Sequence, residues 1–177
     1  MKHGLGVLVI ALLALFAVPK GVAAQERTTQ LKQAESLRCV FEAGHGFEWR
    51  DGAFAGARKE NEDHPVVFDR IDRKSGHARQ VYNTPAVTSR VDNVTVVEFE
   101  WRLPRENSST YGLTFVVIDE YDGFISVAHG QWVGMTTVWS PADPPADPST
   151  YPAVFSHHMA LAAPFPSQFP GSCRVQG

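Results

Sequence analysis

The sequence predicts an all-β fold, an antiparallel barrel-like meander, and three observations predict it. Residues 94–103 alternate between apolar and polar side chains, as in a strand with one buried face. Further short apolar segments follow one another along the chain, separated by turn residues. Helix signals are few. A β-sandwich is the alternative, because it gives the same pattern of short strands and turns.

The first 24 residues have the pattern of a secretory signal peptide. A short basic start precedes an apolar run at 5–18, and small residues lie just before Gln25. This run of about 14 residues is shorter than the roughly 20 that a membrane-spanning helix needs. We therefore expect an exported protein, periplasmic or extracellular, whose mature chain begins at Gln25 and has no transmembrane segment.

The remaining chain is predicted to form one domain. Residues 25–36 are expected to be a leader or a short helix, since Leu31, Ala34 and Leu37 have helical spacing in 28–37. Residues 37–177 are expected to be a single β domain. Its strands are predicted at 37–42, 46–49, 66–72, 77–82, 94–103, 112–119, 124–129, 132–140 and 151–161.

Turns and loops are predicted between these strands. Asp122-Gly123 is expected to turn a hairpin that joins 113–119 to 124–129. The charged segment 50–64 and the proline-rich segment 140–150 are expected to be surface loops. The residues that follow 161 are rich in proline and glycine, and we expect them to form an irregular tail.

Two cysteines remain in the predicted mature chain, Cys39 and Cys173. Exported proteins meet an oxidising environment, so these two residues are expected to form a disulfide. The bond would bring the first and last strands together, as a closed barrel does. It would do so in some sandwiches as well.

The charge of the chain argues against one class of partner. Its formal net charge is −3. A mildly acidic chain lacks the basic surface that nucleic acid or anionic lipid requires, so we expect no nucleic-acid partner.

His157 is the residue in the "SHHMALAAPFPSQFPGSC" segment (156–173) most open to a functional role. Neighbouring side chains on a strand point to opposite faces, so His157 and His158 cannot bind one ion from the same side. His157 shares its parity with Phe155 and Met159 and is expected to point inward. A hydrogen-bonded core histidine is the structural alternative to a ligand-binding one.

Aromatic side chains give the other candidate site. Trp49, Trp101 and Phe99 fall on the parity expected to face inward, and barrels of about eight strands can hold an apolar ligand. His157, Trp101, Trp49 and Phe155 are therefore the predicted ligand-binding residues. The alternative is that the aromatic side chains only fill the core.

Motifs for catalysis or metal binding were not found. The sequence has no HExxH, G-x-S-x-G or P-loop pattern, so we expect neither metal nor cofactor. Glu98 and Glu100 share one strand face, as a glycosidase pair could, but a solvated polar face is the simpler interpretation. No catalytic residue is assigned.

The tail "PSQFPGSC" (166–173), with Ser156 and the two histidines upstream, resembles that of small exported bacterial proteins of unknown function. This resemblance implies no activity. The expected architecture also resembles lipocalins and periplasmic lysozyme inhibitors, although "GFEW" (46–49) departs from the lipocalin G-x-W opening.

These observations predict a non-enzymatic exported protein that binds a small apolar molecule or a protein partner. One alternative is a small hydrolase-like enzyme that uses His157. The other is an enzyme inhibitor that inserts segment 50–64 or 140–150 into a cleft.

Overall fold

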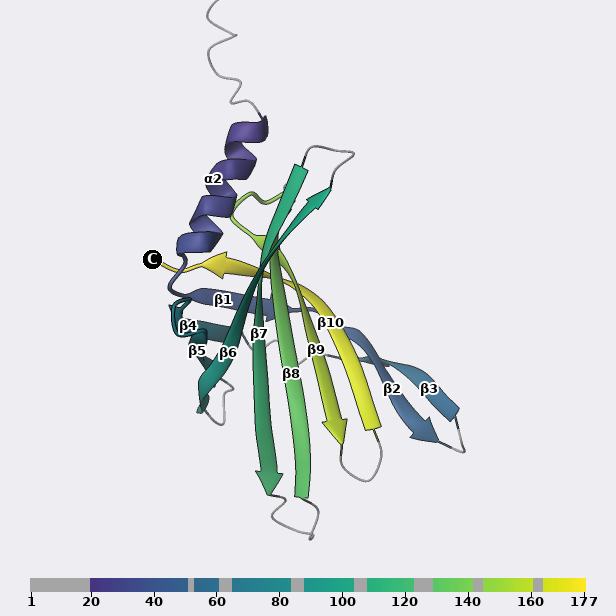
Figure 1. Cartoon of the computed structure of the whole chain (residues 1–177). Helices are drawn as coiled ribbons and strands as arrows, with labels where there is room; N and C mark the ends of the chain where they lie inside the picture. Colours follow the sequence, from purple (N-terminus) through teal and green to yellow (C-terminus); the bar gives the residue numbers. More distant parts are fainter. Residues whose placement is uncertain are drawn as a thin grey trace, which may run out of the picture.

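The computed structural model of the chain describes residues 20–50, 53–60, 65–83, 88–103, 108–122, 129–141, 145–160 and 164–177. Within them, helix α2 (Lys20–Gln33) precedes ten strands that belong to one sheet (Figure 1). The strands are β1 (Leu37–Phe41), β2 (Gly44–Arg50), β3 (Ala53–Lys59), β4 (Val66–Asp72), β5 (His77–Asn83), β6 (Thr88–Leu103), β7 (Ser108–Asp122), β8 (His129–Ser140), β9 (Tyr151–Ala160) and β10 (Pro164–Val175). No helix in these residues is long and apolar enough to cross a membrane.

Eight of the strands close into an antiparallel barrel. From β4 to β10 each strand pairs with the next one in the sequence, and β1 pairs with both β4 and β10. The ring therefore has no free edge. The β2–β3 hairpin lies outside the ring, attached to β10. The predicted barrel-like meander is confirmed.

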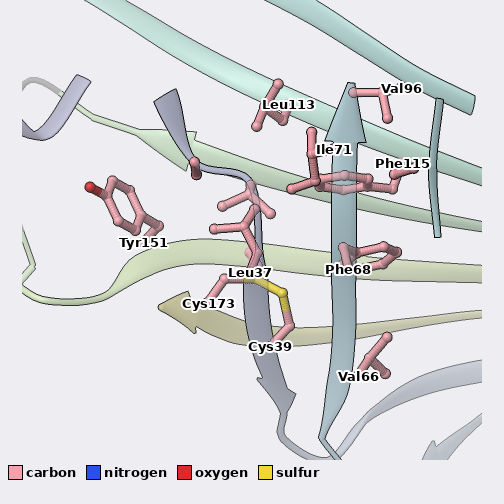
Figure 2. Close-up of a cluster of buried hydrophobic side chains, with 14 of the residues drawn as sticks. Leu37, Cys39, Val66, Phe68, Ile71, Val96, Leu113, Phe115, Tyr151 and Cys173 are labelled. Carbon is pink, nitrogen blue, oxygen red and sulfur yellow. A yellow bond between two sulfur atoms is a disulfide. The ribbon is translucent and has the colours of Figure 1, made fainter. Parts of the chain in front are cut away.

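A disulfide joins the two strands that close the ring. Cys39 on β1 lies directly opposite Cys173 on β10, with a Cα–Cα distance of 4.0 Å. The predicted pairing is confirmed. The bond lies inside the core, and both cysteines are fully buried (Figure 2).

The core fills the barrel around this disulfide. Phe68 on β4 stacks on Phe115 on β7, with ring centroids 4.1 Å apart. Leu37, Leu113 and Tyr151 are also buried almost completely (Figure 2). Burial of each large apolar side chain contributes roughly 1.5–3 kcal/mol. This part of the barrel is a packed core.

Helix α2 covers one end of the barrel. Leu31 is fully buried against the core, and Arg73 donates to the main-chain oxygens of Leu31 and Ala34 at the end of the helix, both at 2.8 Å. Arginine is suited to this position because it satisfies carbonyls that have no partner in the helix itself.

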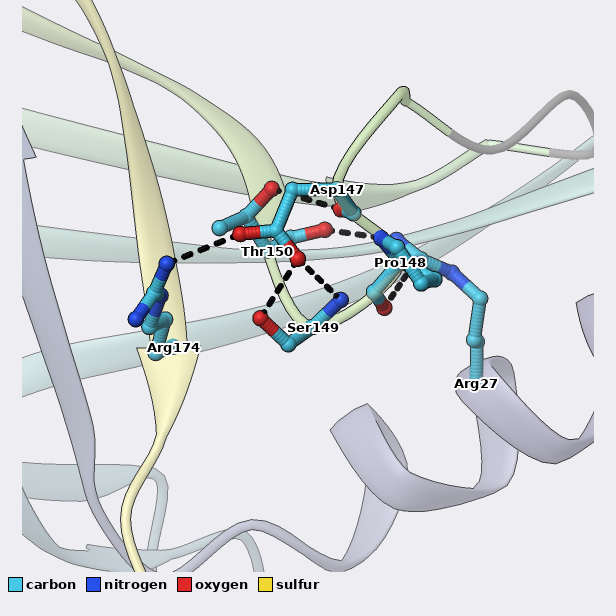
Figure 3. A network of polar contacts seen from close by, with 6 residues as sticks. All are labelled: Arg27, Asp147, Pro148, Ser149, Thr150 and Arg174. Atoms are coloured by element: carbon cyan, nitrogen blue, oxygen red, sulfur yellow. Dashed lines mark hydrogen bonds and ion pairs between the residues drawn. The ribbon is translucent and has the colours of Figure 1, made fainter.

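The segment before β9 fastens the same helix from the other side. Arg27 donates to the main-chain oxygens of Pro148 and Thr150, and Asp147 pairs with Arg174 on β10 at 2.8 Å (Figure 3). These contacts hold the helix against the strands at this end of the barrel.

The wall of the barrel is uneven. β1, β4 and β5 have five to seven residues, whereas β6 to β10 have ten to sixteen. The end of β6 and the start of β7 extend at the α2 end, whereas at the end away from α2, β7 to β10 extend beyond the closed ring, and the β2–β3 hairpin reaches out beside them (Figure 1). On this extension the inner face of the sheet is not closed over by the short strands.

The predicted irregular tail is wrong, because β10 is a regular strand. Glu42 N–H donates to the oxygen of Pro170, so the backbone polar groups of the even-numbered residues of β10 point toward β1 and β2. Pro164, Pro166 and Pro170 are all even-numbered, so none of them removes a donor from the ladder with β9. The prolines are tolerated because they share one parity.

Three further boundaries differ from the prediction. The helix spans 20–33 and ends before Leu37, which starts β1, although Leu31 and Ala34 are buried as expected. β3 lies inside the predicted loop 50–64. Residues 113–119 are predicted to pair with 124–129, whereas residues 113–118 pair with 133–138. The connection 123–128 lies outside the described residues.

The alternation in β6 has the predicted period but the opposite orientation. Val97 is 49% exposed and Trp101 is 68% exposed, whereas Val94 and Val96 face the core. The inner face can carry Glu98 and Glu100 because a cation on α2 and another in the turn after β4 pair with them. Arg73 Nε lies 3.0 Å from Glu98, and Lys32 lies 3.7 Å from Glu100.

Candidate functional site

The candidate site is a row of residues on the inner face of the extension. Gly134 on β8 lies opposite His157 on β9, His157 lies opposite Ser167 on β10, and Ser167 lies opposite Gly46 on β2. Side chains opposite one another on neighbouring strands share a face. His157 is therefore the one large side chain in this row, and it is flanked by residues with small or absent side chains.

Aromatic rings lie next to this row. The Phe155 ring stacks on His157 at 5.9 Å and 16°, and it stacks on Phe169 at 6.0 Å and 23°. Phe41 packs against the other side of Phe155 at 5.6 Å and is buried. The aromatic stack thus starts in the core and ends at His157.

The outer part of the stack is only half-buried although it faces inward. Phe155, His157 and Phe169 are each intermediate in exposure, whereas Phe41 is 2% exposed. Part of the surface of each of these rings therefore remains accessible. Partly exposed aromatic rings are a common component of ligand sites.

Burial lowers the pKa of His157, and the neighbouring His158 lowers that pKa further. An imidazole away from water is poorly stabilised as a cation, so it is held in the neutral form. Neutral imidazole offers one donor and one acceptor. With the Ser167 hydroxyl beside it, the site can recognise a polar group without carrying charge.

The predicted ligand-binding residues are only partly brought together. His157 and Phe155 lie side by side and point inward as expected, while His158 is exposed. Trp49 lies on β2, opposite Phe54, and its side chain lies outside the described part of the chain. The inward orientation predicted for Trp101 is wrong.

Trp101 belongs instead to the outer face of the barrel. Its ring packs beside that of Phe99 at 5.8 Å, and the Phe99 ring covers Gly112 so closely that a Cβ there would lie 2.2 Å from it. Ile118 on β7 is 68% exposed on the same face. These side chains are separated from His157 by the sheet.

No family model, curated protein or solved structure matches this chain. The site must therefore be interpreted from its own chemistry.

Sequence reasoning missed Ser167, Phe169, Gly134 and Gly46. The first two lie in the segment predicted to be irregular, so no parity was assigned to them. Gly134 and Gly46 carry no side-chain signal, and their importance depends on which residue lies opposite. The spacing of Phe165, Ser167 and Phe169 could have indicated the strand if the shared parity of the prolines had been recognised.

Two other features do not add to the site. Within the described residues, no group of three or more His, Cys, Asp or Glu side chains could hold a metal ion. A shallow open depression of about 790 Å³ lies beside α2, at the far end of the barrel. It is lined by Val22, Gln25, Glu26, Arg27, Thr29, Gln30, Gln33 and Pro148.

Proposed function

We propose that the chain is exported and binds a small, largely apolar molecule on the inner face of β8, β9, β10 and β2. The observation that carries the proposal is the half-buried stack of Phe155 and His157 beside Gly134 and Ser167. The rings offer apolar and aromatic contact. The neutral imidazole and the hydroxyl offer one or two hydrogen bonds that would orient the ligand.

Export is part of this proposal. Its support is the signal pattern at 1–24, most of which lies outside the described residues, together with the disulfide. Disulfides persist in oxidising compartments. The proposed location is the periplasm or the extracellular space.

A direct binding titration tests the ligand site. The probe is N-phenyl-1-naphthylamine, a neutral apolar fluorophore, added to the exported protein. We expect saturable binding that weakens about tenfold in His157→Ala, since one lost contact of about 1.4 kcal/mol has that effect. Ser167→Phe should weaken it as well, because the larger ring occupies the space beside the imidazole.

Trp101→Ala is the matched control. It removes a large aromatic side chain from the outer face, so probe affinity should not change. Equal weakening in Trp101→Ala and His157→Ala would refute the proposed site. So would the absence of saturable binding by the wild type.

A hydrolytic enzyme is the second candidate, favoured by the position of Ser167 directly opposite His157. In such a pair the imidazole accepts the proton of the attacking hydroxyl. A carboxylate that oriented the imidazole would raise its pKa, whereas the pKa of His157 is lowered. Binding is therefore the preferred proposal. Labelling of Ser167 by a fluorophosphonate, lost in His157→Ala, would favour the enzyme instead.

A further inference from the structure

The β2–β3 hairpin presents an edge strand. β2 pairs with β10 at Gly46 and His45, and β3 pairs with β2 along its whole length. On the other side of β3, no strand within the described residues pairs with it. Residues 53–58 are exposed on both faces of the hairpin. An edge of this kind is available for pairing with another chain.

The direction of the backbone shows which residues offer that pairing. The backbone N–H and C=O groups of the even-numbered residues of β10 point toward β2. Gln168 lies opposite His45, so the backbone groups of these two residues hydrogen-bond to each other. The direction of the backbone polar groups alternates along β2, so the N–H and C=O groups of Gly46 point toward β3, where Gly46 lies opposite Ala57.

The same alternation continues along β3. Since Ala57 points toward β2, its neighbours Gly56 and Arg58 point their N–H and C=O groups to the free edge, as does Phe54. The free edge therefore carries donors and acceptors at three alternate residues, with Gly56 in the centre.

We propose that β3 pairs antiparallel with β3 of a second copy of this chain, around a two-fold axis at Gly56. In this register Gly56 lies opposite the partner's Gly56, and Phe54 lies opposite the partner's Arg58. About six backbone hydrogen bonds would form across the axis. The pairing is isologous and closes at two copies.

The side chains of β3 favour an antiparallel second copy over a parallel one. Arg58 and Lys59 lie at one end of β3, so an antiparallel copy places them opposite Phe54 and Ala53. Arginine over an aromatic ring is a favourable contact. A parallel copy would instead place Arg58 beside the partner's Arg58, and like charges on opposite positions are destabilising.

Gly56, at the centre of the proposed pairing, has no side chain, so the two β3 strands can approach closely. The Phe47 ring of β2 lies over Gly56, 3.3 Å from where a Cβ would be. Phe47 is 45% exposed and Phe54 is 54% exposed. A second copy would extend the sheet under both rings and cover part of this apolar surface.

Sedimentation equilibrium over a range of protein concentrations tests the proposal with three proteins. The wild type should form a dimer. Phe54→Lys places a cation opposite the partner's Arg58, so dimerisation should require at least about tenfold higher concentration. Phe54→Lys combined with Arg58→Glu restores opposite charges and should restore the dimer. The exposed hairpin lies outside the closed barrel, so all three should melt at similar temperatures.

A cross-link fixes the register. Gly56→Cys places two thiols in a hydrogen-bonded pair with Cα atoms about 5.5 Å apart, which suits a disulfide. It should give a covalent dimer on mild oxidation. Ala53→Cys is the control, because in this register Ala53 lies six residues, roughly 20 Å, from its counterpart.

A wild type that stays monomeric at all concentrations would overturn the proposal. A dimer that Phe54→Lys leaves intact but Val97→Lys on the outer barrel face abolishes would overturn it as well. Efficient cross-linking through residue 53 in place of 56 would show that the register is wrong.

Discussion

Cys39 and Cys173 lie opposite each other at the point where the first and last strands close the barrel. They are 134 residues apart in the sequence, so the bond encloses nearly the whole β domain. In the chain-entropy model a loop of this length restricts the unfolded state strongly. The backbone hydrogen bonds and the disulfide therefore stabilise the same contact, between β1 and β10.

Replacing both cysteines should destabilise the fold without changing its topology. For Cys39→Ala combined with Cys173→Ala, we expect the free energy of unfolding to fall by about 2–5 kcal/mol. Urea unfolding followed by circular dichroism measures the change. The unreduced wild type should contain no alkylatable thiol after denaturation, and two such thiols would contradict the disulfide.

The contact between Arg73 and α2 gives the second prediction. Arg73 donates to two carbonyls at the end of the helix and lies 3.0 Å from Glu98. Arg73→Ala should lower the free energy of unfolding by about 2–3 kcal/mol, because carbonyls in a half-buried position lose charged donors.

Arg90→Ala is the matched control for Arg73. Arg90 pairs with Asp92 at 2.8 Å, but both side chains are more than half exposed. Exposed ion pairs of this kind contribute about 0–1 kcal/mol. Urea midpoints of the two variants, compared at equal unfolding slopes, separate the effects. Equal losses would mean that Arg73 does not secure the helix.

The predicted mature N-terminus can be tested through α2. Within the described residues, hydrogen bonds to the barrel are made by Arg27, Thr28, Gln30 and Leu31 of this helix and by Ala34 just after it. A chain that starts at Gln25 keeps all of them. It should melt at the same temperature as a chain that starts at Met1.

A chain that starts at Glu35 supplies the contrast. It loses Leu31 and Ala34 from the core and exposes the end of the barrel, so it should melt at least several degrees lower, given about 1.5–3 kcal/mol for a buried Leu. Mass spectrometry of the secreted protein reports the cleavage site itself. A first residue other than Gln25 would contradict the prediction.

The barrel could be predicted from the sequence for two reasons. Period-two alternation is visible within a single strand, and the disulfide between the terminal strands depends on only two cysteines. The prediction failed for β6 because alternation gives a period but not a direction. Glu98 and Glu100 face inward there only because Arg73 and Lys32 arrive from other elements. A pairing between distant elements cannot be inferred from one strand.

The candidate site was predicted in part for a similar reason. His157 and Phe155 lie on one strand, so their parity was enough to place them together. Ser167, Gly134 and Gly46 complete the row only through the register of β8, β10 and β2. Register depends on the whole sheet, and the prolines of β10 concealed one of its strands.

His157 gives the last prediction, a change in the pH dependence of stability. Burial, and then His158, lower the pKa of His157 in the folded protein below its ordinary value of 6.5. As the pH falls through about 6.5, the unfolded chain takes up a proton at this residue that the folded chain resists. Stability is therefore present above this pH and is lost as the pH falls toward the folded-state pKa. His157→Gln stays neutral and should lose less stability than the wild type between pH 7 and pH 5.

Urea unfolding at both pH values measures the difference, with His77→Gln, at an exposed position on β5, as the control that keeps the wild-type loss. Parallel losses in His157→Gln and the wild type would show that residue 157 titrates as freely in the folded chain as in the unfolded one.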